Sequence, residues 1–331
     1  MKPLTKPDGI PLMFEAAVAR TRHDLFVACS HRDERFDGFS RLCLFREEKD
    51  PTWAYFDMPV TISDAALFVL ASNAGLSNAP TAYVFLDEDG ELYHLPMGRE
   101  PETERIADSG LWHEDAKGWG YLKSVTQIGS SLYACGGSGQ VYRRLRDGSW
   151  EHIDQGILLT EGIKSDLSLG AIAGPNEEEI YVGGWHTNVN DGILLCRDGQ
   201  CWTSVAHGIP SISSIHIEHE ASIWACGRHG TLLHGNCIDG FKHMLDLDRG
   251  RPYVNVVSYH RQIYLATETG LFFYENGAAH RLKTGLTPEF NDGHILQVVD
   301  GVLWAIGYKD IARFDGTRWE RIPFPGNPLI P

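Results

Sequence analysis

Several polar side chains in this chain of 331 residues are of the types that hydrolytic enzymes use. An arginine cluster could hold a substrate carboxylate beside a nucleophilic tyrosine. The candidates for such a cluster are Arg32, Arg228, Arg249, Arg251 and Tyr308. Carboxylates and amides could instead surround a divalent ion. The candidates for that site are Asn188, Glu268 and Asp310. Their spacing does not require them to meet, and no G-x-S-x-G, H-E-x-x-H or phosphate-loop motif is present. We therefore predict no catalytic residue, no metal site and no cofactor.

A second group of residues has the composition of a protein-binding surface. The segment from Arg99 to Lys117 is rich in acidic residues and contains Trp112, with Trp119 close behind. Aromatic side chains among charges suit a protein interface, although both tryptophans could instead pin the segment to the core. The residues that we expect on the partner-binding face are Arg32, Asp33, Glu34, Arg35, Phe36, Glu102, Glu104, Asp108, Trp112, Trp119, Trp185, His186, Arg228, Asp248, Arg249 and Tyr308.

The overall charge narrows the choice of partner. The formal net charge is −15, and no basic stripe is available to neutralise phosphates, which excludes nucleic-acid binding. An acidic surface favours capture of a basic protein partner. No apolar run reaches about 18 residues, so we expect no membrane span. Residues 1–9 contain no apolar stretch of the kind found in secretory signals. We expect a cytoplasmic monomer.

The seven cysteines fit a reduced chain. No C-x-x-C pair is present, which argues against a zinc site or a redox motif. Cys29, Cys135 and Cys226 lie within apolar runs, where a free thiol acts as a small hydrophobic group. Cys196 and Cys201 flank a short turn and could form a disulfide across a hairpin.

The strongest pattern is an internal repeat. Leu or Ile, then an aromatic residue, then small or aliphatic residues recur seven times. The copies are 25–28, 67–70, 132–135, 180–183, 223–226, 263–266 and 303–306. The mean spacing of about 46 residues is that of a four-stranded propeller blade.

A tight turn follows most copies of the repeat. Asp-Gly and Asn-Gly supply the positive φ angles that short hairpins need. These turns are Asp89-Gly90, Asp147-Gly148, Asp198-Gly199, Asp239-Gly240, Asn276-Gly277 and Asp315-Gly316, with Lys49-Asp50-Pro51 in the first copy. The aromatic residues that follow them are Trp53, Tyr93, Trp150, Trp202 and Trp319. We interpret each copy as the second strand of a blade and each turn as the link between its third and fourth strands.

These marks predict an all-β fold, a seven-bladed β-propeller of four-stranded antiparallel blades. We expect one propeller domain over residues 14–323, with an insertion at about 99–119, an extension at 1–13 and a tail at 324–331. Each end blade can supply its own four strands, and the extension can add to a sheet edge. The loops that join strands 2 and 3, and each strand 4 to the next strand 1, should share one face.

The turns carry a resemblance to a known family. Glu275-Asn276-Gly277, Arg146-Asp147-Gly148-Ser149-Trp150 and the run from Phe314 to Glu320 resemble degenerate Asp-box repeats of sialidase-like bacterial propellers. No copy has the full Ser-x-Asp-x-Gly-x-Thr-Trp spacing. The resemblance implies the blade structure and no activity, since such turns are structural.

Together these features favour a non-catalytic protein-binding propeller. One specific form is an immunity-type inhibitor that captures a basic bacterial toxin such as a nuclease. The alternatives are a propeller that binds a small ligand or glycan, and a sialidase- or lactonase-like hydrolase acting in the central channel.

Overall fold

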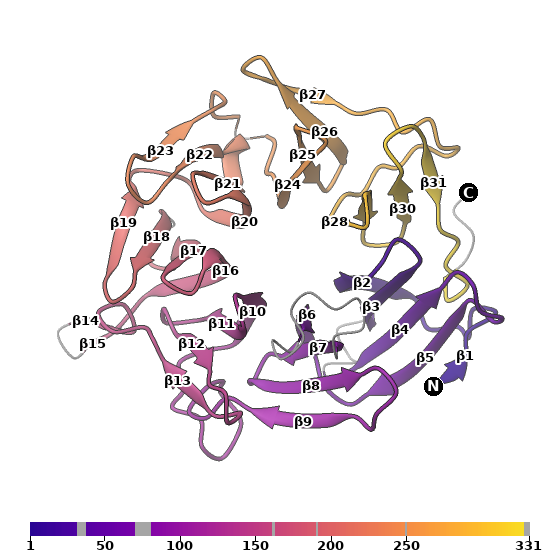
Figure 1. Cartoon of the computed structure of the whole chain (residues 1–331), viewed down its shortest axis with the longest axis horizontal. Coiled ribbons are helices and arrows are strands. Elements are labelled where there is room, and N and C mark those ends of the chain that lie inside the picture. Colours follow the sequence, from indigo (N-terminus) through magenta and orange to yellow (C-terminus); the bar gives the residue numbers. More distant parts are fainter. Residues whose placement is uncertain (32–37, 70–80, 161–162, 190, 249, 328–331) are drawn as a thin grey trace. The chain divides into compact units, whose positions relative to one another are not determined.

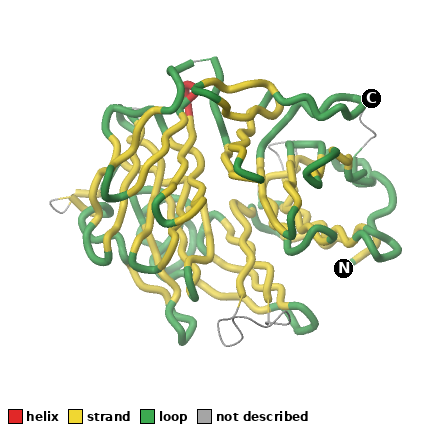
Figure 2. The backbone as a smooth tube through the Cα atoms, turned by 45° about the horizontal axis from the view of Figure 1, so that its top comes forward, coloured by secondary structure: helices red, strands yellow, loops and turns green. Residues whose placement is uncertain are grey.

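The computed structural model describes residues 1–31, 38–69, 81–160, 163–189, 191–248 and 250–327. The chain divides into two compact units, one formed by Met1–Ile62 with Val254–Pro331 and the other by Ser63–Tyr253. Strands make up almost all of the regular structure, and one short 3-10 turn, η3 (Arg228–Gly230), is the exception in the described residues (Figure 2). No helix among these residues is long and apolar enough to cross a membrane.

The first unit contains three antiparallel sheets, which we number blades 1, 6 and 7 (Figure 1). The strands of blade 1 are β2 (Leu12–Ala19), β3 (Asp24–His31), β4 (Ser40–Arg46) and β5 (Trp53–Met58). Those of blade 6 are β24 (Asn255–Tyr259), β25 (Gln262–Thr267), β26 (Gly270–Glu275) and β27 (Ala278–Arg281). Those of blade 7 are β28 (Ile295–Val299), β29 (Val302–Ile306), β30 (Ile311–Phe314) and β31 (Trp319–Arg321).

The second unit contains blades 2 to 5. Blade 2 has β6 (Ile62–Val69), β7 (Thr81–Asp87), β8 (Glu91–Pro96) and β9 (Glu102–Arg105). Blade 3 has β10 (Leu122–Ile128), β11 (Ser131–Gly136), β12 (Val141–Arg144) and β13 (Trp150–His152). Blade 4 has β16 (Leu167–Asn176), β17 (Glu179–His186), β18 (Gly192–Asp198) and β19 (Trp202–Ala206). Blade 5 has β20 (Ile212–His219), β21 (Ser222–Gly227), β22 (Leu232–Asn236) and β23 (Gly240–His243). A small hairpin, β14 (Leu159–Thr160) with β15 (Ile163–Lys164), joins blades 3 and 4.

The predicted fold class is confirmed: the chain is a seven-bladed β-propeller of four-stranded antiparallel blades. Blades 1 and 7 each take four strands from one end of the chain, so no blade is shared between the two ends. The N-terminal strand β1 (Lys2–Pro3) pairs with β5 and adds a fifth strand to blade 1. Within the first unit, Trp304 of blade 7 packs into the same buried cluster as Leu25 of blade 1.

The sequence repeat marks the second strand in six blades. In β11, β17, β21 and β29 the residues of the repeat are buried one after another, on both faces of the sheet. A strand buried on both faces needs apolar side chains without alternation, which explains why this strand gave the clearest pattern.

In blade 2 the repeat was assigned to the wrong strand. Residues 67–69 lie at the end of the first strand, β6, and the second strand is β7. Asp89-Gly90 therefore links strands 2 and 3, and Tyr93 lies on strand 3. Both β6 and β7 carry buried apolar residues, so the apolar run alone did not distinguish the two strands.

Polar side chains form hydrogen bonds between the first strands of neighbouring blades. The amide of Gln127 on β10 accepts a hydrogen bond from the backbone N–H of Val69 at 2.8 Å and donates to the carbonyl of Val69 at 3.1 Å. In the first unit, Gln297 on β28 bonds to Ala19 and Ala17 of β2 in the same way. Each amide thus satisfies backbone groups that strand pairing leaves open.

The possible disulfide between Cys196 and Cys201 is not formed, and the expectation that the other cysteines are reduced is wrong for Cys237. Cys196 on β18 is bonded to Cys237, which follows β22, so the bridge joins blades 4 and 5. Cys196 is buried and lies opposite Thr203 in the hairpin, whereas Cys201 lies at the exposed turn. Cys29, Cys135 and Cys226 are free and buried, as predicted.

A buried ion pair joins blades 2 and 3. Glu104 on β9 accepts hydrogen bonds from Nε and Nη2 of Arg144 at 2.8 Å, and from the indole N–H of Trp150. The side chains of Glu104 and Arg144 are only 17% and 19% exposed, so neither charge is well solvated. The carboxylate therefore has a structural partner within the protein.

We expect Glu104→Gln to lower the free energy of unfolding by about 2 kcal/mol, because Arg144 loses its anion while it stays mostly buried. The control Glu102→Gln lies on the same strand but is exposed, and it should change stability by less than about 0.5 kcal/mol. Urea unfolding followed by circular dichroism measures both. Equal midpoints for the two variants would contradict a structural role for Glu104.

A second prediction concerns pH. Burial raises the pKa of Asp64 on β6 to about 6, although its carboxylate accepts hydrogen bonds from the N–H of Val125 and the hydroxyl of Ser124. The folded state then binds a proton more tightly than the unfolded chain does. Asp64 therefore contributes stability below about pH 4 that is lost as the pH rises through 6. We expect wild-type stability to fall by roughly 2 kcal/mol more than that of Asp64→Asn between pH 4 and pH 7. Parallel curves for the two proteins in urea titrations would exclude this role.

Candidate protein-binding face

In the second unit, the connections between successive blades lie at the same end as the loops between strands 2 and 3. In an antiparallel blade, strand 1 begins where strand 2 ends, strand 3 begins and strand 4 ends. The loops between strands 2 and 3 and between successive blades therefore lie together. We call this surface the loop face; its described segments are residues 88–90, 106–121, 137–140, 153–160, 163–166, 187–189, 191, 207–211, 228–231, 244–248 and 250–253.

Hydrogen bonds connect these loops from blade to blade. The backbone N–H of Gly137 donates to the carbonyl of Tyr121 at 2.9 Å, and Lys164 reaches the carbonyl of Gly118. The N–H of Arg228 donates to the carbonyl of Ser211 at 2.9 Å. The further contacts of this kind are Thr187 to Asp166, Gly192 to Ile209 and Asp248 to His229. The loop face is thus a continuous, internally bonded surface.

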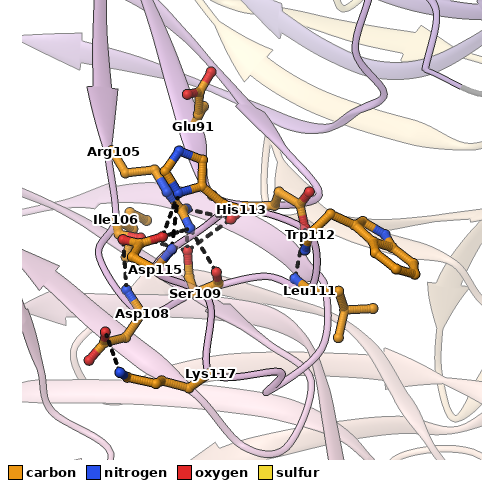
Figure 3. Close-up of polar contacts among 12 residues, drawn as sticks. Glu91, Arg105, Ile106, Asp108, Ser109, Leu111, Trp112, His113, Asp115 and Lys117 are labelled. Carbon is orange, nitrogen blue, oxygen red and sulfur yellow. Dashed lines mark hydrogen bonds and ion pairs between the residues drawn. The ribbon is translucent and has the colours of Figure 1, made fainter.

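The segment 106–121 is held by a central arginine. Arg105, at the end of β9, donates to the hydroxyl and the carbonyl of Ser109 at 2.8 Å and to Asp115 at 2.7 Å (Figure 3). Asp115 is also 2.6 Å from the ring of His113. Although partial burial opposes the effect, the hydrogen bonds from Arg105 and His113 lower the pKa of Asp115. The charges of Arg105, His113 and Asp115 therefore pair with one another within the loop and are not available to a partner.

The same network presents Trp112 to solvent. The N–H groups of Leu111 and Trp112 both donate to the carboxylate of Asp89, at 2.8 and 3.2 Å. In Figure 3 the indole points away from the Arg105 network. The side chain is 77% exposed, and its N–H donates to the hydroxyl of Tyr121. Trp112 therefore does not pin the loop to the core, whereas Trp119 is half-buried.

Exposed apolar side chains are concentrated on the loop face. Most of the large apolar side chains that are exposed in the described residues lie there. These are Leu111, Trp112, Ile163, Val189 and Leu247; the others are Met1, Met97, Ile238 and Val298. A surface of hydrogen-bonded loops with exposed apolar side chains spread over them is typical of a protein-binding site.

Acidic side chains accompany these apolar groups. Glu114 is close in sequence to Trp112, Asp191 to Val189, and Asp246 and Asp248 flank Leu247; all four carboxylates belong to exposed residues. Exposed apolar side chains with exposed carboxylates close by in sequence would suit a partner that presents both apolar and basic groups.

The other residues that the sequence singled out lie in several places. Trp185 and His186 end β17, Arg228 is in η3, and Asp108 and Asp248 are in the connections of the loop face. His186 pairs with Asp166 at 2.9 Å and lowers the pKa of that carboxylate. Residues 32–36 and Arg249 lie outside the described residues. The expectation that Glu102 and Glu104 belong to a long loop is wrong, because both lie on β9, the fourth strand of blade 2.

Candidates for catalysis in the first unit have structural partners. Asp310 is buried and accepts two hydrogen bonds from Arg321, at 3.0 and 2.8 Å. Tyr308 stacks on His294 with 4.5 Å between ring centroids. A cavity of about 510 Å³ in this unit lies along the outer strand β5, with Trp53 and Phe324 among its lining residues.

Some residues of the loop face were missed from sequence. Val189 and Ile163 are single apolar residues in polar segments, and a single residue of that kind carries no pattern. Leu247 between two aspartates could have been noticed, because an apolar side chain in an acidic connection has no evident core to join. Lys123 was missed because it lies within a strand.

No family model matches the chain. Among solved structures, YCF48 from Cyanidioschyzon merolae has a TM-score of 0.62 and 13% identity, with 94% of this chain and 97% of that chain covered. The WD40 β-propeller domain of Doa1 has a TM-score of 0.56 and 11% identity, with 96% of each chain covered. At these identities the likeness concerns the fold alone.

The sequence comparison is more specific. The chain is 31% identical over 241 residues to a protein of Pseudomonas aeruginosa named immune protein Tsi7, and the match covers 72% of this chain and 75% of that one. Identity of this extent over most of both chains establishes common descent. The chain therefore belongs to the family of the immune protein Tsi7.

Proposed function

We propose that this protein is a non-catalytic immunity protein that binds a bacterial protein toxin and neutralises it. Membership of the Tsi7 family supports an immunity role. The single structural observation that carries the proposal is the set of exposed apolar side chains on the hydrogen-bonded loops of blades 2 to 5.

The surface chemistry supports a basic partner. Exposed carboxylates stand beside the exposed apolar groups, and the whole chain has a net charge of −15. Opposite charge would accelerate encounter, and apolar contacts would then slow dissociation. We propose that the toxin presents a basic surface with apolar side chains at its centre. The Asp-box resemblance concerns blade turns, and we propose no sialidase-like activity from it.

The first experiment identifies the partner. The tagged protein is incubated with extract of its native host at low and at high salt, and bound proteins are identified by mass spectrometry. We expect one stoichiometric basic protein that high salt releases. Its expression alone should stop bacterial growth, and co-expression of this chain should restore growth. A captured protein that is harmless when expressed would contradict the immunity role.

We expect the triple variant Trp112→Ser, Val189→Ser, Leu247→Ser to bind the purified toxin at least about 30-fold more weakly, because central apolar anchors supply most of the binding energy of an interface. Calorimetric titration measures the affinity. The matched control is Ile238→Ser, which removes a side chain that is 93% exposed at the turn between strands 3 and 4 of blade 5. Equal affinities of the triple variant and the wild type would show that the toxin binds elsewhere.

A further inference from the structure

Three side chains from three successive blades meet at the loop-face end of the second unit. Lys123 is on β10, Trp185 ends β17, and Arg228 begins η3. The Nζ atom of Lys123 lies 4.4 Å from the centre of the Trp185 ring, and the guanidinium carbon of Arg228 lies 6.0 Å from it. Two cations thus lie within contact range of one indole.

Lys123 is an unusual cation in this protein. Among the described residues, no carboxylate lies within 4 Å of its Nζ, which donates one hydrogen bond, to the hydroxyl of Ser168 at 2.7 Å. An ammonium group has three donors, so two remain. The side chain is half-buried, and burial lowers its pKa. By contrast, the largely buried Arg144, Arg313 and Arg321 each bind a carboxylate.

Glu88 acts on Lys123 electrostatically, but its carboxylate is not in contact with the ammonium group. A half-buried ammonium with no carboxylate in contact is costly, and a bound anion would offset the cost. The shape of the site selects the anion. A carboxylate accepts hydrogen bonds at both oxygens, so it can bridge a lysine and an arginine. The indole supplies an apolar wall for the methylene groups that carry such a carboxylate. A polyanion such as a nucleic acid would be repelled by the exposed carboxylate of Asp191, which precedes the Gly192 that pairs with Trp185.

We propose that Lys123, Trp185 and Arg228 form a receptor site for an aspartate or glutamate side chain of the bound toxin. The proposal rests on the proposed function and makes it more specific: the toxin surface is basic overall, with one acidic residue that enters this site. The two cations bind the carboxylate, and the Trp185 ring packs against its methylene groups.

The first test asks whether the site binds a carboxylate, without any toxin. Glutarate is titrated at constant ionic strength, and the indole N–H signal of Trp185, assigned with Trp185→Phe, is followed by NMR. We expect a saturable shift with a dissociation constant of about 10 mM, weakened at least tenfold in Lys123→Gln. The control Lys242→Gln makes the same charge change at an exposed residue of β23, outside the loop face, and should leave the shift intact. No saturable shift, or the same shift in Lys123→Gln, would overturn the site.

The second test asks whether the carboxylate belongs to the toxin. Affinity for the purified toxin should fall at least tenfold in Lys123→Gln and in Arg228→Gln, remain within threefold in Lys123→Arg, and be unchanged in Lys242→Gln. Thermal unfolding checks that each variant is folded. Toxin binding that is indifferent to Lys123→Gln, while glutarate binding is lost, would show a site for a free small anion and overturn the docking proposal. If no toxin is captured at all, the proposed function fails, and the glutarate titration still decides the chemistry of the site.

Discussion

Burial of the inner strands of the blades on both faces is the constraint on which this structure depends. The second strands, such as β11 and β29, have apolar or small side chains on both sides, and neither side is covered within the blade itself. A four-stranded sheet of this kind can be stable only when neighbouring blades pack against it. The polar links between blades, such as Gln127 and the Glu104–Arg144 pair, then satisfy groups that this packing has removed from water.

This constraint separates the scaffold from the surface. Strand positions are fixed by packing on both sides, whereas the connections between strands are free to differ in length and composition. In the second unit these connections are bonded to one another and to strand ends, as Arg105 shows for the segment 106–121. A loop that is already ordered loses little conformational entropy when a partner binds, so a small number of apolar side chains can supply useful affinity.

The sequence predicted the blades well because their signals are local. A buried second strand and an Asp-Gly turn are each contained in a few consecutive residues. The errors have a common physical origin. The strand order of blade 2 depends on which strands lie side by side. The partner of Cys196 depends on which blades do, because Cys237 is in another blade. The candidate face shows the same limit: Trp112 was noticed as an aromatic residue among charges, whereas Lys123 acquires its character only from Trp185 and Ser168 of the next blade.

The net charge of the chain and the cationic site on the loop face would act at different stages of binding. A net charge of −15 attracts any basic protein, and attraction of that kind discriminates poorly among basic partners. At short range, Lys123 and Arg228 beside the Trp185 ring instead require an acidic group on the partner. A partner with a basic or apolar group at that point would leave Lys123 buried with no carboxylate in contact, or place like charges together, and either cost weakens the wrong complex. Long-range attraction would therefore govern the rate of encounter, and the small cationic site would govern which basic protein remains bound.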